Sequence, residues 1–250
     1  MVYKQVEYRA VYKDETRAMP DLVPGNRFKK RLAASVVGKH GEFLRALGGN
    51  AELHQWLKAQ QPFPYFSERF QLYEDIQAKI LHNEPIDYLE FGVFHGDSIL
   101  KWASINSHPE SRFIGFDSFE GLPAAPDGIT GYAPEGTFST AGAVPSTGDP
   151  RVRFVTGWFN KTLRPFLRDF QARSRLVIHN DSDLYSSTLY MLSTIDPILT
   201  PGSILIFDEF ASPLHEWKAF RDYSHAFDHN YRVLGAAGHY YTQVALQMIK

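Results

Sequence analysis

The chain has 250 residues, of which 44% are hydrophobic, 14% aromatic and 22% charged, and this composition is typical of a packed α/β protein and excludes a disordered or low-complexity chain. Lysine and arginine (26 residues) nearly balance aspartate and glutamate (28 residues), so the net charge of −2 offers no basic surface for nucleic acid. The chain has no cysteine, which excludes disulfides and thiolate chemistry, so a metal would need oxygen or imidazole ligands.

Residues 1–85 are predicted to form a helical arm or lid. Apolar residues at three- and four-residue spacing predict helices at Lys29–Leu47, Ala51–Ala59 and Glu68–Leu81, and prolines punctuate the region. The first residues have no apolar signal core, and no run approaches the ~20 apolar residues of a membrane span. We therefore expect a cytoplasmic protein with no membrane partner.

Residues 86–250 predict a catalytic domain with a Rossmann-like α/β fold, because short apolar runs alternate with segments of helical length. The runs that predict buried parallel strands are Ile86–Phe91, Phe113–Phe116, Val152–Thr156, Leu176–His179 and Ile204–Phe207. The predicted helices between and after them are Ser98–Asn106, Leu163–Phe170, Thr188–Leu199 and Leu214–Phe227. Two further stretches, Arg232–Leu234 and Gln243–Ile249, predict an antiparallel hairpin at a sheet edge, which makes seven strands with helices on both faces.

A glycine loop follows the first of these strands in the segment YLEFGVFHGDSIL. Gly92 and Gly96 are spaced as GxxxG, not as the GxGxxG of a dinucleotide site, and the carboxylate of Glu90 would repel a pyrophosphate. Such a carboxylate favours a cationic group, such as the amino acid portion of S-adenosylmethionine. The second strand ends in Asp117, which can accept hydrogen bonds from ribose hydroxyls, and together these features predict a nucleoside site without a phosphate.

Four acids follow the fourth and fifth strands: Asp181 and Asp183, then Asp208 and Glu209. Because ligands bind at the carboxyl ends of parallel strands, these side chains should converge, and a divalent cation such as Mg²⁺ would relieve their repulsion. A cap role for Asp181 or Asp208 is the alternative. His179 lies inside an apolar run and is interpreted as a packed residue, not a ligand.

Other kinds of site are weakly supported. The chain has no GxSxG elbow and no Walker GxxxxGK[ST] loop, so hydrolase and nucleotide triphosphatase hypotheses have no motif behind them. Trp158 either covers an adenine face or fills the core, and the core interpretation is favoured. The long loop from Gly121 to Pro150 is rich in Gly, Pro, Ala and Thr and is expected to border a substrate site.

These residues resemble the class I S-adenosylmethionine-dependent methyltransferases, and within them the macrocin O-methyltransferase group of metal-dependent sugar O-methyltransferases. The matching words are LEFGVFHGDS, GFDSFEGLP, GWFNKTL, DSDLYSSTLYML and PGSILIFDEF. The resemblance implies a seven-stranded sheet in the order 3-2-1-4-5-7-6, with S-adenosylmethionine over strands one and two. It also implies Mg²⁺ beside the transferred methyl group and a small-molecule hydroxyl acceptor, and it leaves a homo-oligomer open.

The resemblance also implies roles for individual residues. The cofactor would lie among Glu90, Gly92, Gly96, Asp117, Ser118 and Asp181. The metal would be bound by Asp181, Asp208 and Glu209, where Glu209 stands in place of the second aspartate that is usual in the family. Asp183 would be the general base.

Three alternatives differ in their chemistry. A catechol-type or phenol-type O-methyltransferase typically has a lysine three residues after the first metal aspartate, and that position is Leu184 in this chain. A protein that kept the fold and the cofactor site without catalysis is the second alternative. A NAD-dependent dehydrogenase is the third, and the GxxxG spacing with Glu90 counts against it.

Overall fold

The computed structural model describes residues 27–124 and 133–250. The chain divides into two compact units, Met1–Leu44 and Arg45–Lys250. Helix α1 (Arg27–Gln60) runs from the described part of the first unit into the second, with non-helical backbone angles at His40. Residues 1–26 of the predicted arm and residues 125–132 of the predicted 121–150 loop lie outside the described residues.

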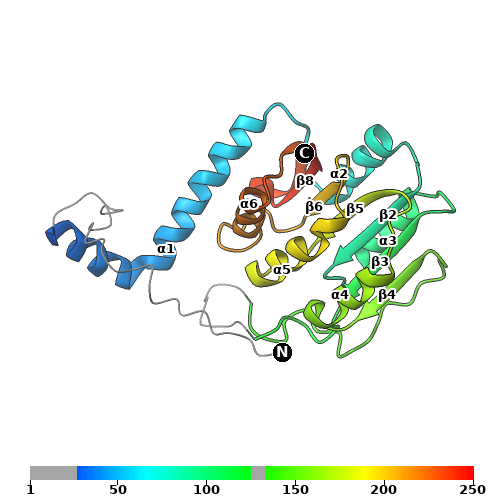
Figure 1. The fold of residues 1–250 in the computed structure, drawn as a ribbon, viewed down its shortest axis with the longest axis horizontal. Helices are drawn as coiled ribbons and strands as arrows, with labels where there is room; N and C mark the ends of the chain where they lie inside the picture. Colours follow the sequence, from blue (N-terminus) through cyan, green and yellow to red (C-terminus); the bar gives the residue numbers. More distant parts are fainter. Residues whose placement is uncertain (1–26, 125–132) are drawn as a thin grey trace, which may run out of the picture. The chain divides into compact units, whose positions relative to one another are not determined.

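The second unit is built on an eight-stranded sheet (Figure 1). Its strands are β1 (Tyr65–Phe66), β2 (Ile86–Phe91), β3 (Arg112–Asp117), β4 (Val152–Thr156), β5 (Arg175–Asn180), β6 (Ile204–Phe207), β7 (Tyr231–Ala237) and β8 (Gln243–Met248). They lie in the order β1-β7-β8-β6-β5-β2-β3-β4, and β8 alone is antiparallel to its neighbours. The predicted order of seven strands is therefore confirmed, including the hairpin of β7 and β8.

The additional strand, β1, lies beside β7 at the edge of the sheet. It has two residues, which is too short to show an alternating pattern in the sequence. Pro64, just before β1, and Phe66 of β1 accept backbone hydrogen bonds from Ala236 and Gly238, respectively. Residues 45–85 therefore belong to the same compact unit as the sheet, and the division after Leu44 differs from the boundary expected near residue 85.

The helices follow the predicted positions closely. They are α2 (Arg69–Ile76), which continues as a π-helical turn (Gln77–Leu81), and α3 (Asp97–Ile105), α4 (Phe159–Asp169), α5 (Tyr185–Ile195) and α6 (Glu216–Ala226). The two helices expected before residue 60 are one helix, α1. Leu53 and Leu57, one turn apart on α1, are almost fully buried in the core, so packing stabilises this part of the helix despite the glycines at 48 and 49.

Two apolar layers cover the sheet, one on each face. The face that presents Leu89 and Phe91 packs against α4, α5, α6 and the last turns of α1, and Figure 1 shows α4, α5 and α6 along that side. The face that presents Tyr88 packs against α2 and α3. Strand β2 is buried at all six positions because its side chains alternate between these two layers. In the part of the chain that the structure describes, no helix is long and apolar enough to span a membrane.

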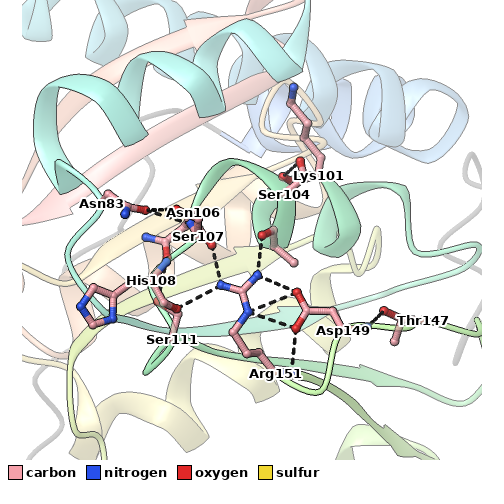
Figure 2. Close-up of polar contacts among 11 residues, drawn as sticks. Asn83, Lys101, Ser104, Asn106, Ser107, His108, Ser111, Thr147, Asp149 and Arg151 are labelled. Carbon is pink, nitrogen blue, oxygen red and sulfur yellow. Dashed lines mark hydrogen bonds and ion pairs between the residues drawn. The ribbon is translucent and has the colours of Figure 1, made fainter.

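Arg151 ties together the segments that precede β3 and β4 (Figure 2). Its Nε and Nη2 groups donate to the carboxylate of Asp149. Nη1 donates to the carbonyl oxygens of Asn106 and His108, and Nη2 also donates to the carbonyl of Ala103 near the end of α3. These contacts match the five N–H donors of a guanidinium, and they lie at the opposite end of the sheet from the candidate site.

Candidate active site

A cavity of about 800 Å³ lies at the carboxyl ends of β2, β3, β5 and β6. Every site residue predicted from the sequence lines this cavity except Gly96. The lining residues from these strand ends and the adjoining segments include Glu90, Gly92, Val93, Phe94, Asp117, Ser118, Phe138, Trp158, Asp181, Asp183, Tyr190, Asp208 and Glu209. The strands of an open parallel sheet thus bring the glycine loop and the acidic residues to one site, as expected for this fold.

Gly92 is required by a close approach between the loops after β2 and β5. Its φ is +89°, and a Cβ atom at this position would lie 1.8 Å from the carbonyl oxygen of Asp181. Gly96 has a φ of +85° and is the N-cap of α3, where its N–H donates to the carbonyl of Val93 at 2.8 Å. Gly92 therefore shapes the cavity wall, whereas Gly96 shapes the turn that enters α3.

The carboxylate of Asp117 organises the glycine loop. Its Oδ2 accepts from the backbone N–H groups of Val93 (2.7 Å) and Phe94 (2.9 Å), and its Oδ1 accepts from that of Phe119 (2.7 Å). An ionised carboxylate has about four acceptor sites, so these bonds leave about one for a ligand. The predicted ribose contact therefore has to share Asp117 with a structural role that the sequence did not reveal.

Trp158 also borders this cavity. It is half-buried, precedes α4 and is not part of the buried apolar core. The core interpretation favoured by the sequence is therefore wrong, because Trp158 presents part of its surface to the cavity.

A buried polar group lies beneath the cavity on the face covered by α2 and α3. Glu90 and His179 are register partners on β2 and β5, and His179 Nδ1 lies 3.3 Å from Glu90 Oε2. Tyr88 Oη hydrogen-bonds to both of them, at 2.8 Å from His179 Nδ1. On the other side of the ring, His179 Nε2 lies 3.3 Å from Tyr73 Oη and 3.8 Å from Asp208 Oδ1. His179 is fully buried, as predicted, and it links the two carboxylates.

The charge of His179 follows from these neighbours. Burial lowers the pKa of His179, but its hydrogen bonds to Asp208 and Glu90 and the charges of those carboxylates outweigh burial and raise the pKa to about 10. The imidazole is therefore protonated at neutral pH. In the sequence, the only sign of this arrangement was a histidine inside the apolar run of β5, the strand that pairs with the strand of Glu90. The sequence did not identify Asp208 as a partner of His179.

Arg69, the first residue of α2, brings a second cation to Asp208. Its Nη1 lies 3.2 Å from Asp208 Oδ2 and 3.4 Å from Oδ1, and the guanidinium lines the cavity. Burial raises the pKa of Asp208, but the hydrogen bond from His179 and the charges of His179 and Arg69 outweigh it and lower the pKa below its ordinary value. The sequence placed residue 69 in the arm and did not identify it as a site residue.

A second polar group lies on the opposite face of the sheet, beneath α6. Asn180 Nδ2 donates to Glu216 Oε1 at 2.5 Å, and the backbone N–H of Glu209 donates to Glu216 Oε2 at 2.9 Å. Ser182 and Thr188 complete the network around Asn180. Burial, followed by the charge of Asp181, raises the pKa of Glu216 well above its ordinary value. These bonds hold the segments after β5 and β6 against each other.

The remaining acids are crowded. Burial and the charges of Asp208 and Asp183 raise the pKa of Glu209 to about 7. Desolvation, followed by the charge of Asp208, raises the pKa of Asp181 well above its ordinary value. Asp208, beside Arg69 and His179, therefore has a lowered pKa, whereas Asp181 and Glu209 bind protons more readily than usual.

The predicted metal site is not formed by this arrangement. Among residues 27–124 and 133–250, no three His, Asp or Glu side chains come together in a group that could hold a metal ion. The oxygen donors suit Mg²⁺ chemically. However, the carboxylate of Asp208 is already paired with Arg69 and His179, so the expected ligand set of Asp181, Asp208 and Glu209 does not fit the ion in this structure.

The fold and the site together resemble one class of protein. A mostly parallel Rossmann-like sheet with a GxxxG loop after β2, an acid at the end of β3 and a cavity over both is the arrangement of the class I methyltransferases. Residues 89–210 match the family model described as a methyltransferase domain. Over these residues, which are a little under half of the chain, the chain is similar to that family.

Two relatives show the similarity in sequence. The 8-demethyl-8-(2,3-dimethoxy-alpha-L-rhamnosyl)-tetracenomycin-C 4'-O-methyltransferase of Streptomyces olivaceus is 30% identical over 158 residues, which are 54% of this chain and 57% of the relative. The demethyldecarbamoylnovobiocin O-methyltransferase of Streptomyces niveus is 31% identical over 154 residues, which are 54% of this chain and 56% of the relative. The chain thus spans a little over half the length of these relatives.

Two solved structures show the similarity in fold. The calicheamicin methyltransferase CalS11 superposes with a TM-score of 0.57 at 24% identity, over 71% of this chain and 77% of that chain. The O-methyltransferase NovP superposes with a TM-score of 0.55 at 23% identity, over 73% of this chain and 80% of that chain. At this level of identity, the similarity supports the Rossmann-like fold described above.

Proposed function

We propose that the protein is an S-adenosylmethionine-dependent O-methyltransferase that transfers a methyl group to a hydroxyl of a sugar or of a glycosylated small molecule. The observation that carries this proposal is a cavity that joins two kinds of surface. One end has the glycine loop and Asp117, and the other has Asp183, Asp208 and Glu209. A cofactor at the first end would present its methyl group toward an acceptor at the second.

The cofactor end suits S-adenosylmethionine for physical reasons. Glu90 is buried and borders the cavity, so its carboxylate can attract the cationic amino acid portion of the cofactor. Asp117 retains about one acceptor site for a ribose hydroxyl, Ser118 lies beside it, and Trp158 offers an aromatic face for the adenine. The backbone N–H of Asp181 donates to the carbonyl oxygen of Phe91 at 2.8 Å, so Asp181 lies next to the glycine loop.

The acceptor end suits deprotonation of a hydroxyl. We assign Asp183 as the general base, because it lines the cavity two residues after Asp181 and is mostly buried. A weakly acidic sugar hydroxyl needs a positioned base to accept its proton during the attack on the methyl carbon. Much of the remaining rate acceleration would come from holding the hydroxyl oxygen in line with the methyl–sulfur bond.

The proposed acceptor class has support from a relative and from one residue. The name of the Streptomyces olivaceus relative specifies a rhamnosyl group and a 4'-O-methyl transfer. The position that carries a lysine in catechol-type enzymes is Leu184, and its side chain is buried. A sugar hydroxyl is therefore favoured over a phenol. Assistance by Mg²⁺ is not part of this proposal, because Asp208 is paired with Arg69 and His179.

The test is methyl transfer from labelled S-adenosylmethionine to a panel of glycosides and matched phenols, with the products weighed by mass spectrometry. We expect a glycoside to gain one methyl group and its aglycone alone to gain none. Methylation of phenols but not of glycosides would favour the catechol-type alternative. Calorimetry with S-adenosylhomocysteine is the control, and an absence of binding would contradict the whole proposal. The cytoplasmic location expected from the sequence stays a prediction.

A further inference from the structure

We propose that the guanidinium of Arg69, held by Asp208, supplies the positive charge at the acceptor end of the cavity, where the sugar O-methyltransferase resemblance implies Mg²⁺. This inference rests on the proposed function. It assigns Arg69 as a further catalytic residue, and it implies that a divalent cation is neither bound tightly nor needed at this site.

The position of Arg69 follows from the packing of α2. Leu72, Tyr73 and Ile76 of this helix are buried against the face of the sheet that presents Tyr88. Arg69 precedes Leu72 by three residues, so it lies on the same side of the helix, one turn nearer its start. That turn lies over the end of β6, and Arg69 Nη1 reaches Asp208 Oδ2 at 3.2 Å.

Arg69 is suited to contact a ligand as well as Asp208. Its side chain is 31% exposed, and it borders the cavity. Among the described residues, Arg69 donates side-chain hydrogen bonds only through Nη1, to the two carboxylate oxygens of Asp208. A guanidinium has five N–H donors, so Nε and Nη2 can donate to the acceptor oxygen, on which negative charge develops as its proton passes to the base.

The same contacts oppose a metal ion. A divalent cation needs ionised carboxylate oxygens at about 2.0–2.1 Å for Mg²⁺, and it would have to share Asp208 with the guanidinium. His179, on the other side of Asp208, is a second partner at 3.8 Å. The guanidinium beside this carboxylate would repel a further cation, whereas removal of Arg69 would leave Asp208 next to Asp181 and Glu209 with less positive charge nearby.

The test combines three substitutions. Arg69→Met keeps the length and apolar bulk of the side chain but removes its charge, and Arg69→Lys keeps the charge but loses the planar donor group. Arg175→Met is the matched control, because Arg175 pairs with Glu84 at the amino end of β5, away from the cavity. Melting temperature and calorimetry with S-adenosylhomocysteine report whether each variant is folded and binds the cofactor product.

The first measurement is binding of Mn²⁺ by electron paramagnetic resonance, which needs no acceptor substrate. We expect weak binding, with a Kd of about 1 mM or higher, to wild type, Arg69→Lys and Arg175→Met. We expect at least about tenfold tighter binding to Arg69→Met, since one neighbouring positive charge is lost. Micromolar binding to wild type, or equal affinity of wild type and Arg69→Met, would overturn the proposal. If Arg69→Met does not fold, the Mn²⁺ affinities of wild type and Arg69→Lys test the proposal: weak binding to both supports it, and micromolar binding to wild type overturns it.

The second measurement is turnover of a glycoside acceptor with and without EDTA. We expect wild-type turnover to be unchanged by EDTA, a loss of about 10²–10³ in kcat for Arg69→Met, and partial recovery in Arg69→Lys. Loss of wild-type turnover in EDTA that Mg²⁺ restores would overturn the proposal. Failure of the proposed function is distinguishable, because it would appear as absent binding of S-adenosylhomocysteine, whereas the Mn²⁺ measurement reports on Arg69 independently.

Discussion

Asp183 has a left-handed backbone conformation, with a φ of +60°, at the position assigned to the general base. Such a conformation is uncommon for a residue other than glycine, although aspartate tolerates it better than most. Strained residues of this kind cluster at functional sites, where the surrounding structure holds them. The loop after β5 supplies that support through the buried network of Asn180 and Glu216.

The role of Asp183 can be tested by Asp183→Asn. The amide has nearly the same shape and also tolerates the left-handed conformation, but it cannot accept a proton. We expect kcat to fall by about 10²–10⁴, with little change in the affinity for S-adenosylmethionine. Steady-state kinetics and calorimetry check these two quantities. A variant with wild-type kcat would show that another group, such as Glu209, accepts the proton.

Asp117 combines a structural and a ligand-binding role, and the two can be separated. Asp117→Ala should weaken S-adenosylhomocysteine binding by about 1.5–3 kcal/mol and also lower the free energy of unfolding by about 1–3 kcal/mol, since three loop N–H groups lose their acceptor. Asp117→Asn retains one oxygen, so its S-adenosylhomocysteine affinity and its free energy of unfolding should both lie between those of wild type and Asp117→Ala. Calorimetry and urea denaturation measure these changes. An unchanged free energy of unfolding with weaker binding would restrict Asp117 to the ribose.

Glu209 predicts a pH dependence of stability. Its pKa in the folded protein is about 7, against an ordinary value of 4.5, because of burial and the charges of Asp208 and Asp183. Because folding raises the pKa of this acid, the folded protein holds the proton of Glu209 more tightly than the unfolded chain does. The free energy of unfolding that Glu209 contributes is therefore complete below about pH 4.5 and is lost as the pH rises toward 7. Because the side chain is partly exposed, solvent screening limits this loss to about 1–2 kcal/mol.

Glu209→Gln removes this titration. Urea denaturation in EDTA at several pH values between 4.5 and 8 should show a smaller decline in the free energy of unfolding for the variant than for wild type. The exposed-acid variant Glu84→Gln is the control and should follow the wild-type curve. Parallel curves for Glu209→Gln and wild type would show that the pKa of Glu209 is not raised in the folded protein.

At the scale of the elements, one end of the sheet carries the cavity and the other is stabilised by hydrogen bonds. The carboxyl ends of the strands carry the cavity, with strained residues and closely spaced acids. The amino ends of β3 and β4 carry the hydrogen bonds of Arg151, which join the end of α3 to the segments entering both strands (Figure 2). The closely spaced acids and strained residues thus lie at one end of the sheet. At the other end, all the N–H donors of Arg151 have acceptors.

Arg151→Lys tests the contribution of that end. The ammonium has three donors in place of five and cannot reproduce the planar contacts with Asp149 and the three carbonyl groups. We expect the free energy of unfolding to fall by about 1–3 kcal/mol, with no change in S-adenosylhomocysteine affinity. Arg173→Lys is the control on the same side of the sheet. Weaker cofactor binding in folded Arg151→Lys would mean that the two ends of the sheet are coupled.

At the scale of the whole molecule, the division after Leu44 predicts which part of the chain is needed for the site. Residues from Arg45 onward include Trp56, whose ring lies 5.4 Å from that of Trp217, and the buried side chains of Leu53 and Leu57. These residues complete the apolar layer over β6 and α6. They are part of the core, although the sequence placed them in an arm.

We therefore expect a protein starting at Arg45 to fold and to bind S-adenosylhomocysteine with the affinity of the full chain. Leu57→Ala in the full chain should instead lower the free energy of unfolding by about 2–5 kcal/mol, because it leaves a cavity in a buried layer. Calorimetry and chemical denaturation measure both effects. A truncated protein that is unfolded would show that residues 1–44 contribute to the stability of the second unit.

The sequence by itself determined the positions of seven strands, the positions of α2 to α6 and the residues of the glycine loop and the acidic segments. These features were accessible because they depend on local patterns: apolar runs of strand length, helical spacing between them, and the rule that parallel strands present their carboxyl ends at one edge. The order of the seven strands in the sheet came from the resemblance to a family. Strand β1 was missed because two residues carry no periodicity.

Only the tertiary structure decided how the charges of the site are balanced. Asp208 and Arg69 are 139 residues apart in the chain, and Asn180 and Glu216 are 36 apart. They meet because α2 and α6 pack on opposite faces of the sheet. From the sequence, four neighbouring acids predict a bound cation, since no local residue neutralises them. In the folded protein, Arg69 and His179 provide positive charge beside Asp208, and the geometry of helix packing, which no local pattern encodes, brings them there.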